Sequence, residues 1–384
     1  MNRIPFSRPF VGEEEIAEVV QTMRSGWLTT GPKTQKFEED FRQMVGVPHA
    51  LGTNSCTGAL HLALLGLGVK PGDEVITSTM TFAATGNVIV HCGARPVLAD
   101  VDPETLNIDP EDAAARITPR TKALIAVHYA GRPCAMDALT RLCRQHGLAL
   151  LEDAAHAVGG SYQGKAVGAL GDAAGFSFYA NKNLTTGEGG MMTTRSPEVF
   201  ERARLLRLQG MTRDVFRREN PGASAQTWRY EITAPGFKYA MADIQAAIGI
   251  HQLRRFPTMQ KRRQEITDRY SAELRGLPGL ALPPPVAAGS VHAWHLYVVR
   301  VGPGAPLTRD QLFSHLAEQG IDCSVHFMPL HLQPFYEEFL GTRPGQFPRA
   351  ESAFEQVLSL PLFPTLSEAD QTRVIEAVRK ALIR

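Results

Sequence analysis

Short apolar runs alternate with helix-like patterns between residues 50 and 195 of this 384-residue chain. Each short apolar run predicts a buried strand, and the stretches between them repeat apolar residues every three to four positions, as amphipathic helices do. The expected strands are 73–79, 95–102, 121–131, 148–156, 173–180 and 191–195, and the expected helices are 59–69, 81–93 and 136–147. Strands that alternate with helices predict an α/β domain with a central, mostly parallel sheet.

The pattern changes beyond residue 255, where a charged helical stretch is followed by the proline-rich segment LPGLALPPPVAAG. We therefore expect a large domain over residues 1–255 and a smaller C-terminal α+β domain over residues 256–384. The smaller domain is expected to contain strands at 294–301 and 321–327 and helices at 309–320 and 368–383. Residues 212–235 have little periodicity and predict a long surface loop.

Composition excludes several classes of protein. Lys and Arg number 40 and Asp and Glu 39, with no block of like charge, which argues against nucleic acid as the main partner. The five cysteines are scattered without CxxC spacing, so neither a disulfide framework nor a metal site is indicated, and we expect a cytoplasmic protein. No apolar run approaches the roughly 20 residues of a membrane span, and no membrane partner is expected.

One lysine stands between a predicted strand and a glycine-rich turn. Lys182 lies in the stretch SFYANKNLTTGEGG, where an aromatic run precedes it and a double glycine leads into the next apolar run. Lysines usually lie on solvated surfaces. A lysine at the meeting point of two buried strands is a candidate for covalent catalysis, and pyridoxal phosphate is the commonest partner for Schiff-base chemistry of lysine.

That cofactor would need an acid near its pyridine nitrogen and a flat side chain against its ring. Asp153 follows a predicted strand, far enough before Lys182 for a strand and a return crossover between them. A helix-capping aspartate is an equally good interpretation. Phe82 is a candidate for the ring face, although a single phenylalanine is more often part of the core.

The cofactor would also need hydroxyls and backbone amides around its phosphate. Ser55 and Thr57 supply hydroxyls, and Gly58 opens a helix whose first amides point at an anion. Read singly, this stretch is more often an ordinary N-cap. Ser177 could reach the same phosphate, and His156 could contact the phenolic oxygen of the cofactor, although a single histidine is more often structural.

The order and spacing of these residues resemble the sugar-nucleotide aminotransferases of the DegT/StrS type, which are fold-type I pyridoxal phosphate enzymes. The resemblance runs almost end to end, through segments such as NSCTGALHLAL, LLEDAAHAVG, FSFYANKNLTTGEGG, PGFKYAMADIQAAIG and HAWHLYVVRV. It implies a large domain with a mostly parallel sheet, a smaller C-terminal domain, pyridoxal 5′-phosphate as cofactor and a homodimer with shared active sites.

Carried over to this sequence, the family pattern makes Lys182 the catalytic Schiff-base lysine and Asp153 the partner of the pyridinium nitrogen. His156 stands where the family has Gln or His near the cofactor oxygen. The rest of the implied cofactor shell is Phe82, Ser55, Thr57, Gly58 and Ser177. Two positions depart from the common pattern: Lys238 replaces an Asn that reaches the phosphate bound by the partner subunit, and Cys56 replaces a Gly.

The segments are most similar to those of members that make UDP-4-amino-4-deoxy-L-arabinose, and members acting on 4-keto-6-deoxy hexoses share most of them. The resemblance implies transfer of the amino group of L-glutamate to C4 of a nucleotide-linked 4-keto sugar, a UDP-4-keto-pentose or a 4-keto-6-deoxy hexose. Such products serve cell-surface polysaccharide or lipid A biosynthesis. Candidates for the pocket around sugar and diphosphate, each also explicable by loop packing, are Trp27, Thr29, Thr30, His128, Tyr129, His326 and His331.

Two other functions stay open at this point. Some family members use the cofactor to dehydrate a sugar, but they have His in place of the lysine, so Lys182 disfavours this alternative. A non-catalytic regulator that binds the cofactor is the second alternative, and neither a basic helix nor a DNA-binding module supports it.

Overall fold

A seven-stranded sheet forms the centre of the protein, whose computed structural model describes residues 2–212 and 230–383. Its strand order is β1-β9-β8-β5-β4-β2-β3. The strands are β1 (His49–Thr53), β2 (Glu74–Ser78), β3 (Arg95–Ala99), β4 (Thr121–Val127), β5 (Ala149–Asp153), β8 (Ala173–Ser177) and β9 (Gly190–Thr194). The strands from β8 to β3 are parallel, whereas β9 is antiparallel to both β8 and β1. The prediction of a mostly parallel α/β sheet is confirmed.

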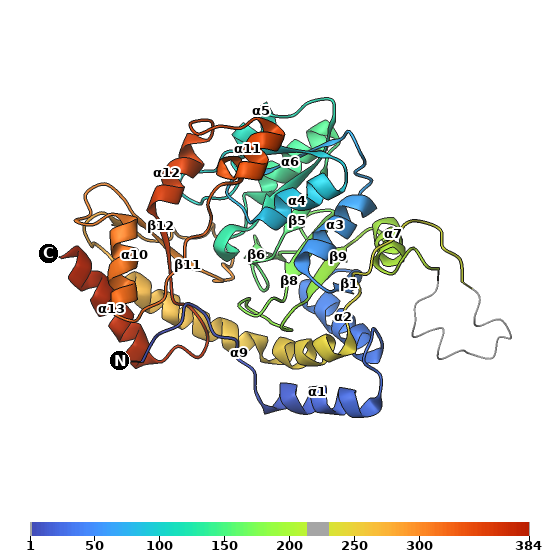
Figure 1. Ribbon diagram of the computed structural model, residues 1–384, viewed down its shortest axis with the longest axis horizontal. Helices are drawn as coiled ribbons and strands as arrows, with labels where there is room; N and C mark the ends of the chain where they lie inside the picture. The colour runs from blue at the N-terminus through green and yellow to red at the C-terminus, as the bar shows by residue number, and fades with distance from the viewer. Residues whose placement is uncertain (1, 213–229, 384) are drawn as a thin grey trace.

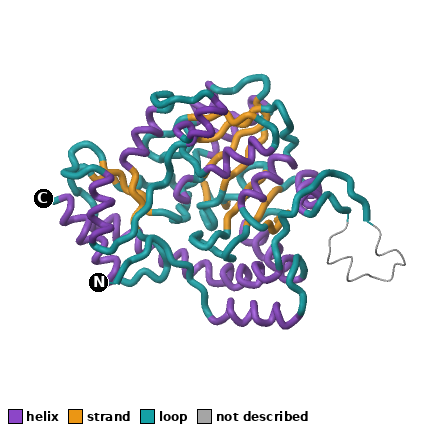
Figure 2. The backbone as a smooth tube through the Cα atoms, in the orientation of Figure 1, coloured by secondary structure: helices purple, strands orange, loops and turns teal. Residues whose placement is uncertain are grey.

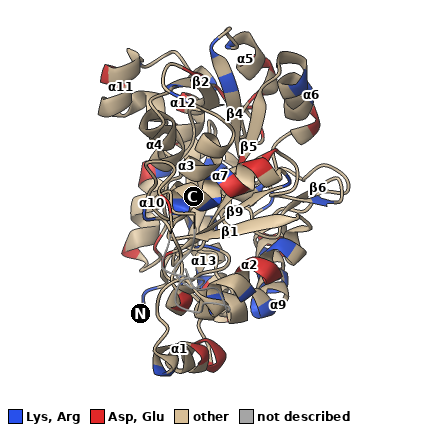
Figure 3. Cartoon of the chain, turned by 90° about the vertical axis from the view of Figure 1, so that its right-hand side faces the viewer, with Lys and Arg blue, Asp and Glu red and all other residues tan. Residues whose placement is uncertain are grey.

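Helices cover both faces of this sheet, so that the strands lie inside a helical shell (Figure 2). Alternate residues of a strand point to opposite faces, and Ile125 and Leu124 of β4 accordingly belong to different apolar clusters. One face packs against α3 (Cys56–Gly66), α4 (Ala83–His91) and α7 (Pro197–Arg207). The other face packs against α2 (Pro32–Val45), α5 (Pro110–Ala115), α6 (Met136–His146) and the first half of α9 (Asp243–Glu273). Charged residues colour the surrounding helices, while β1 and β9 carry none (Figure 3).

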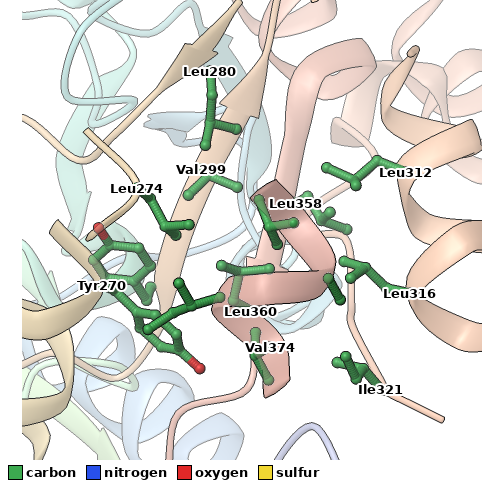
Figure 4. Close-up of a cluster of buried hydrophobic side chains, with 14 of the residues drawn as sticks. Tyr270, Leu274, Leu280, Val299, Leu312, Leu316, Ile321, Leu358, Leu360 and Val374 are labelled. Carbon is green, nitrogen blue, oxygen red and sulfur yellow. The ribbon is translucent and has the colours of Figure 1, made fainter. Parts of the chain in front are cut away.

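The C-terminal part builds a second core around a three-stranded antiparallel sheet in the order β10-β11-β12. Its elements are β10 (Leu280–Ala281), β11 (Tyr297–Val301), β12 (Val357–Leu360), α10 (Arg309–Glu318) and α13 (Glu368–Leu382). Tyr270 of α9 and Leu274, which caps the end of this helix, pack against Val299 and Leu358 of this sheet (Figure 4). The remaining elements are α1 (Glu13–Ser25), β6 (Ser161–Tyr162), β7 (Lys165–Ala166), α11 (Pro334–Leu340), α12 (Pro348–Gln356) and the 3₁₀ turns Tyr129–Gly131 and Leu330–Leu332.

The helix α9 joins the two cores without interruption. It runs for 31 residues and contains Pro257, next to the position where the sequence suggests a domain boundary. Ile250 and Phe256 are buried in a core of the large sheet, whereas Ile266 and Tyr270 are buried in the core of the small one. The change of core thus falls inside a helix, which extends along the lower edge of the molecule with α1 beneath it (Figure 1).

One expected strand is absent from the structure, and most of one expected loop lies outside the described residues. The strand expected at 321–327 is wrong: only Ile321 and Ser324 form isolated bridges there, to Ile4 and Ser359. Of the loop expected at 212–235, residues 213–229 lie outside the described residues. Within the described ranges, no helix has the length and hydropathy needed to cross a bilayer.

Candidate active site

A cavity of about 350 Å³ lies at the carboxyl ends of the parallel strands, where α/β sheets commonly bind ligands. Asp153 ends β5 and Ser177 ends β8, so two neighbouring strands deliver their last residues to the same place. Of the residues selected from the sequence, those that line the cavity are Ser55, Thr57, Phe82, Asp153, His156, Ser177, Lys182 and His326.

The connection between β8 and β9 carries Lys182 into the cavity. Backbone bonds close this loop at its base, where the Phe178 amide donates to the Gly189 carbonyl at 2.9 Å and the Thr186 amide donates to the Phe178 carbonyl at 2.9 Å. Leu184 anchors the loop in the apolar core. Burial lowers the pKa of Lys182 to about 8, against the raising effects of Cys56 and Asp153. The lysine therefore has a much larger fraction of nucleophilic, neutral amine than a surface lysine.

Asp153 is a buried carboxyl group held by two donors. The Thr85 hydroxyl donates to it at 2.7 Å and the Ala155 amide at 3.1 Å. Thr81, 2.8 Å from the Thr85 hydroxyl, completes a chain of hydroxyls behind the carboxylate. Burial raises the pKa of Asp153, although both hydrogen bonds and the charge of Lys182 lower it. A cation bound in front of Asp153 would restore the ionised form, which is what a protonated pyridine nitrogen provides.

The start of α3 forms the anion-binding end of the cavity. Ser55 caps this helix, and its hydroxyl accepts a hydrogen bond from the Gly58 amide at 3.1 Å. The earlier amides of α3, at Cys56 and Thr57, are not used by this cap, and the helix dipole favours a negative charge there. A Cβ on Gly190 would lie 2.5 Å from the Ser55 carbonyl carbon, so only glycine lets β9 approach the helix start so closely.

Three histidines also line the cavity: His156, His295 and His326. Burial is the main cause that lowers the pKa of each, to about 4 for His326 and well below the usual value for the other two. The charge of Lys182 lowers all three further. Nδ1 of His156 is buried without a hydrogen-bond partner among the described residues, which marks a polar contact that a ligand can complete.

Phe82 precedes α4 at the cavity and exposes 62% of its surface. Its ring centroid lies 5.9 Å from that of Phe327. An exposed ring beside a polar cavity is costly unless a flat ligand covers it. The buried acid, the lysine of lowered pKa, the helix start and this ring together fit pyridoxal phosphate.

Three of the sugar-pocket candidates are buried and do not line the cavity. His128 is fully buried and both ring nitrogens have neighbours: Nδ1 lies 3.1 Å from the Cys134 amide nitrogen and Nε2 lies 3.0 Å from a carboxylate oxygen of Glu152. Both nitrogens of His331 are also used, by Thr79 at 2.7 Å and Glu351 at 2.9 Å. The hydroxyl of Tyr129, likewise buried, donates to the His326 carbonyl. The ring nitrogens of both histidines thus have partners among the described residues, and contact of these three residues with a sugar stays a prediction.

Four other candidates lie away from the cavity within this chain. Trp27, Thr29 and Thr30 form the turn before α2, where the Thr30 hydroxyl donates to the Met241 carbonyl at 2.6 Å and the Thr29 carbonyl accepts from the Asp243 amide at 3.2 Å. Lys238 is exposed beside α3, and its carbonyl accepts from Asn54 at 3.3 Å. Their roles toward a second subunit stay predictions.

Several lining residues were not found from the sequence. His295 lies in the quoted segment HAWHLYVVRV, but its distance along the chain from Lys182 gave no sign of contact. Thr85 was inside an expected helix and had no distinguishing pattern. The spacing of Thr85 after Thr81, one helical turn, was the only available signal.

Comparison with known proteins agrees with this geometry. Residues 9–379 match the model of the DegT/DnrJ/EryC1/StrS aminotransferase family. The chain is 49% identical over 378 residues to the spore coat polysaccharide biosynthesis protein SpsC of Bacillus subtilis, covering 98% of this chain and 96% of that protein. Its structure resembles the PLP-form of the putative sugar aminotransferase Spr1654 from Streptococcus pneumoniae, with a TM-score of 0.92, 35% identity and 99% of each chain covered. It also resembles Helicobacter pylori PseC, an aminotransferase involved in pseudoaminic acid biosynthesis, with a TM-score of 0.91, 29% identity and 100% of each chain covered.

Proposed function

Because this chain belongs to the DegT/DnrJ/EryC1/StrS aminotransferase family, we propose that it transfers the amino group of L-glutamate to C4 of a nucleotide-linked 4-keto sugar. The protein is a pyridoxal phosphate-dependent aminotransferase of the type that acts on sugars. One observation carries the proposal: Lys182 and Asp153 line the same cavity, which uncharged histidines also line. The sugar, the nucleotide and the donor are the parts that the experiment below must test.

The large sheet supplies the groups that would hold the cofactor. Asp153 would hold the pyridine nitrogen in its protonated form, the start of α3 with Ser177 would bind the phosphate, and Phe82 would cover the ring. When bound, pyridoxal phosphate supplies an electron sink for the carbon that loses its proton. Lys182 Nζ then removes and returns that proton, a role that its lowered pKa suits because a base works best near the ambient pH.

The histidine side of the cavity supports a sugar as the amino acceptor. His295 and His326 are held neutral, so they offer hydrogen bonds without placing charge against the ring hydroxyls. The name of SpsC ties one relative to polysaccharide biosynthesis. We infer a product used for a cell-surface polysaccharide or lipid A sugar, with a UDP-4-keto-pentose or a 4-keto-6-deoxy hexose as the acceptor.

A second copy of the chain completes the proposed working unit. Ile16, Val20 and Met23 are exposed on α1, spaced as one stripe of a helix, and such a stripe needs cover. Lys238 is exposed near the start of α3 and is proposed to reach the phosphate bound by the other subunit.

Mixing two inactive variants tests the shared site. Lys182→Ala and Lys238→Ala homodimers are each expected to be impaired, but a hybrid dimer contains one site with both lysines. Random mixing makes half of the dimers hybrid, so about a quarter of the wild-type activity should return. If the two variants exchange subunits but no activity returns, the proposal of a shared site is wrong. A fully active monomer in light scattering would also contradict it.

A substrate panel tests the reaction. Holoenzyme and glutamate are incubated with UDP-4-keto-pentose, UDP- and dTDP-4-keto-6-deoxy hexoses and GDP-4-keto-6-deoxymannose, while 2-oxoglutarate is measured. At least one nucleotide sugar should react, and the Lys182→Ala variant should release no 2-oxoglutarate. Reaction with a free keto-inositol or a simple 2-oxo acid alone would refute the sugar-nucleotide assignment and leave only the transaminase.

A further inference from the structure

His295 is a buried pocket residue whose position is fixed from several directions. Its amide donates to the Ala130 carbonyl at 3.1 Å, and its carbonyl lies 3.5 Å from a guanidinium nitrogen of Arg263. The same Arg263 nitrogen donates to the Trp294 and Leu362 carbonyls, both at 3.2 Å. Arg263 is itself buried in α9 and thus holds the histidine-bearing segment against the cavity wall.

Asn183 determines which nitrogen of His295 carries the proton. The Asn183 amide group donates to the Ala293 carbonyl at 2.5 Å, and a carbonyl can only accept. The Asn183 side-chain oxygen must therefore face Nδ1 of His295, which lies 3.2 Å away. Because that oxygen is an acceptor, Nδ1 carries the hydrogen and Nε2 carries a lone pair.

The charges around His295 keep it in this neutral state. Burial lowers its pKa first, and His156, Lys182, Arg263 and His326 lower it further. All four neighbours are cationic or neutral. Nε2 has no hydrogen-bond partner among the described residues, and His295 lines the cavity. The cavity therefore contains a fixed hydrogen-bond acceptor that lacks a donor.

We propose that Nε2 of His295 accepts a hydrogen bond from a hydroxyl group of the bound sugar, which makes His295 a residue that positions and selects the amino acceptor. The inference rests on the proposed sugar substrate. The polar groups of the cofactor already have candidates in Asp153, Lys182, His156 and the start of α3, so His295 is left for the substrate. A neutral acceptor rewards a hydroxyl and gives nothing to a carboxylate, which has no proton to donate. The one donor group of glutamate is the amine, which is the group that must react at the cofactor, so His295 favours the sugar over the amino donor.

The half-reaction with the keto sugar and the half-reaction with glutamate can be measured separately. They distinguish a role in sugar binding from a role that both half-reactions need. His295→Phe keeps a ring of similar size but removes the lone pair, and His295→Gln puts a side-chain oxygen close to the position of Nε2. We expect His295→Phe to lower kcat/KM for the keto sugar about 10- to 100-fold, the size of one lost hydrogen bond in a buried site. His295→Gln should recover most of this loss. The half-reaction with glutamate should change less than about threefold in both variants.

Binding without reaction provides a second readout. The 4-hydroxy counterpart of the reactive sugar nucleotide has no ketone, so its Kd can be measured by calorimetry on the holoenzyme. His295→Phe should weaken this ligand about 10-fold or more and leave the Kd of the bare nucleoside diphosphate unchanged. The matched control is His292→Phe, which removes a buried imidazole from the same segment outside the cavity and should change neither Kd.

The outcomes distinguish the inference from the proposed function. If wild-type enzyme aminates no nucleotide sugar, the proposed function fails. If it does so and His295→Phe retains its sugar kinetics and Kd, only the inference fails. An equal loss in both half-reactions, or a loss of cofactor affinity, would assign His295 to the cofactor and also overturn the inference.

Discussion

The pKa of Lys182 makes the loading of cofactor-free enzyme depend on pH in a defined way. A lysine in water has a pKa near 10.4, so about 0.04% of it is neutral at pH 7. Lys182, with a pKa of about 8, has about a tenth in the neutral form at the same pH. Only the neutral amine attacks the aldehyde of pyridoxal phosphate. At pH 7 the reactive fraction is thus about 200-fold larger than on a surface lysine.

Rapid mixing of apoenzyme with pyridoxal phosphate between pH 6 and pH 10 measures this fraction. Covalently attached cofactor is trapped with borohydride and counted by mass spectrometry. The same reaction with Nα-acetyl-lysine, divided by the neutral fraction of that amine at each pH, corrects for the pH response of the cofactor. The corrected rate should rise about tenfold per pH unit below 8 and level off above it.

A variant gives the sign of the effect. The charge of Asp153 raises the pKa of Lys182, so Asp153→Asn should move the midpoint to lower pH. A wild-type midpoint near 10 would refute burial as the dominant cause, and an upward shift in Asp153→Asn would refute the raising effect of Asp153.

Four further predictions concern the cofactor and the fold. Lys182→Ala should abolish the covalent attachment of pyridoxal phosphate, and a borohydride-stable adduct at the site would contradict this. Asp153→Asn should lower turnover far more than cofactor content, because it removes the charge that keeps the pyridine nitrogen protonated; normal turnover of the loaded fraction would show the role to be wrong. Gly190→Ala should weaken cofactor binding, since the new Cβ pushes on Ser55 at the start of α3, and an unchanged Kd would mean that the phosphate binds elsewhere. Glu152→Ala should lower the free energy of unfolding by at least about 2 kcal/mol, because it strands buried amide donors; urea denaturation measures it, with no change as the contrary result.

The large sheet could be predicted because its strands are buried on both faces. Runs such as EVITS and AAGFS, which combine apolar, β-branched and small residues, predict strands regardless of which helix covers them. The antiparallel β9 is a different case. The run MMTT predicts a strand, but its direction depends on the length of the loop that carries Lys182, and nothing in the run itself encodes direction.

Roles that depend on contacts across the sequence were harder to predict. His128 follows β4, where ligand-binding residues also lie, and His331 lies in a 3₁₀ turn. Only the positions of Glu152 and Glu351 show that a ring nitrogen of each histidine is already used. His295 lines the cavity, but its place in the sequence gave no sign of this. Only the structure shows that Arg263 of α9 holds the segment of His295 beside the cavity.

Because α9 is continuous, the direction in which its first half faces the large sheet determines the direction in which its second half faces the small sheet. Each residue turns an α-helix by about 100°, so one inserted residue near Pro257 would rotate Tyr270 and its neighbours by that angle relative to Ile250. The apolar faces on the two halves would then no longer point at their own sheets. Insertions and deletions in this helix are therefore tolerable only when they add or remove close to a whole number of turns. This limit applies to any engineered or natural change of length between the sheet that binds the cofactor and the C-terminal part that carries His295 and His326.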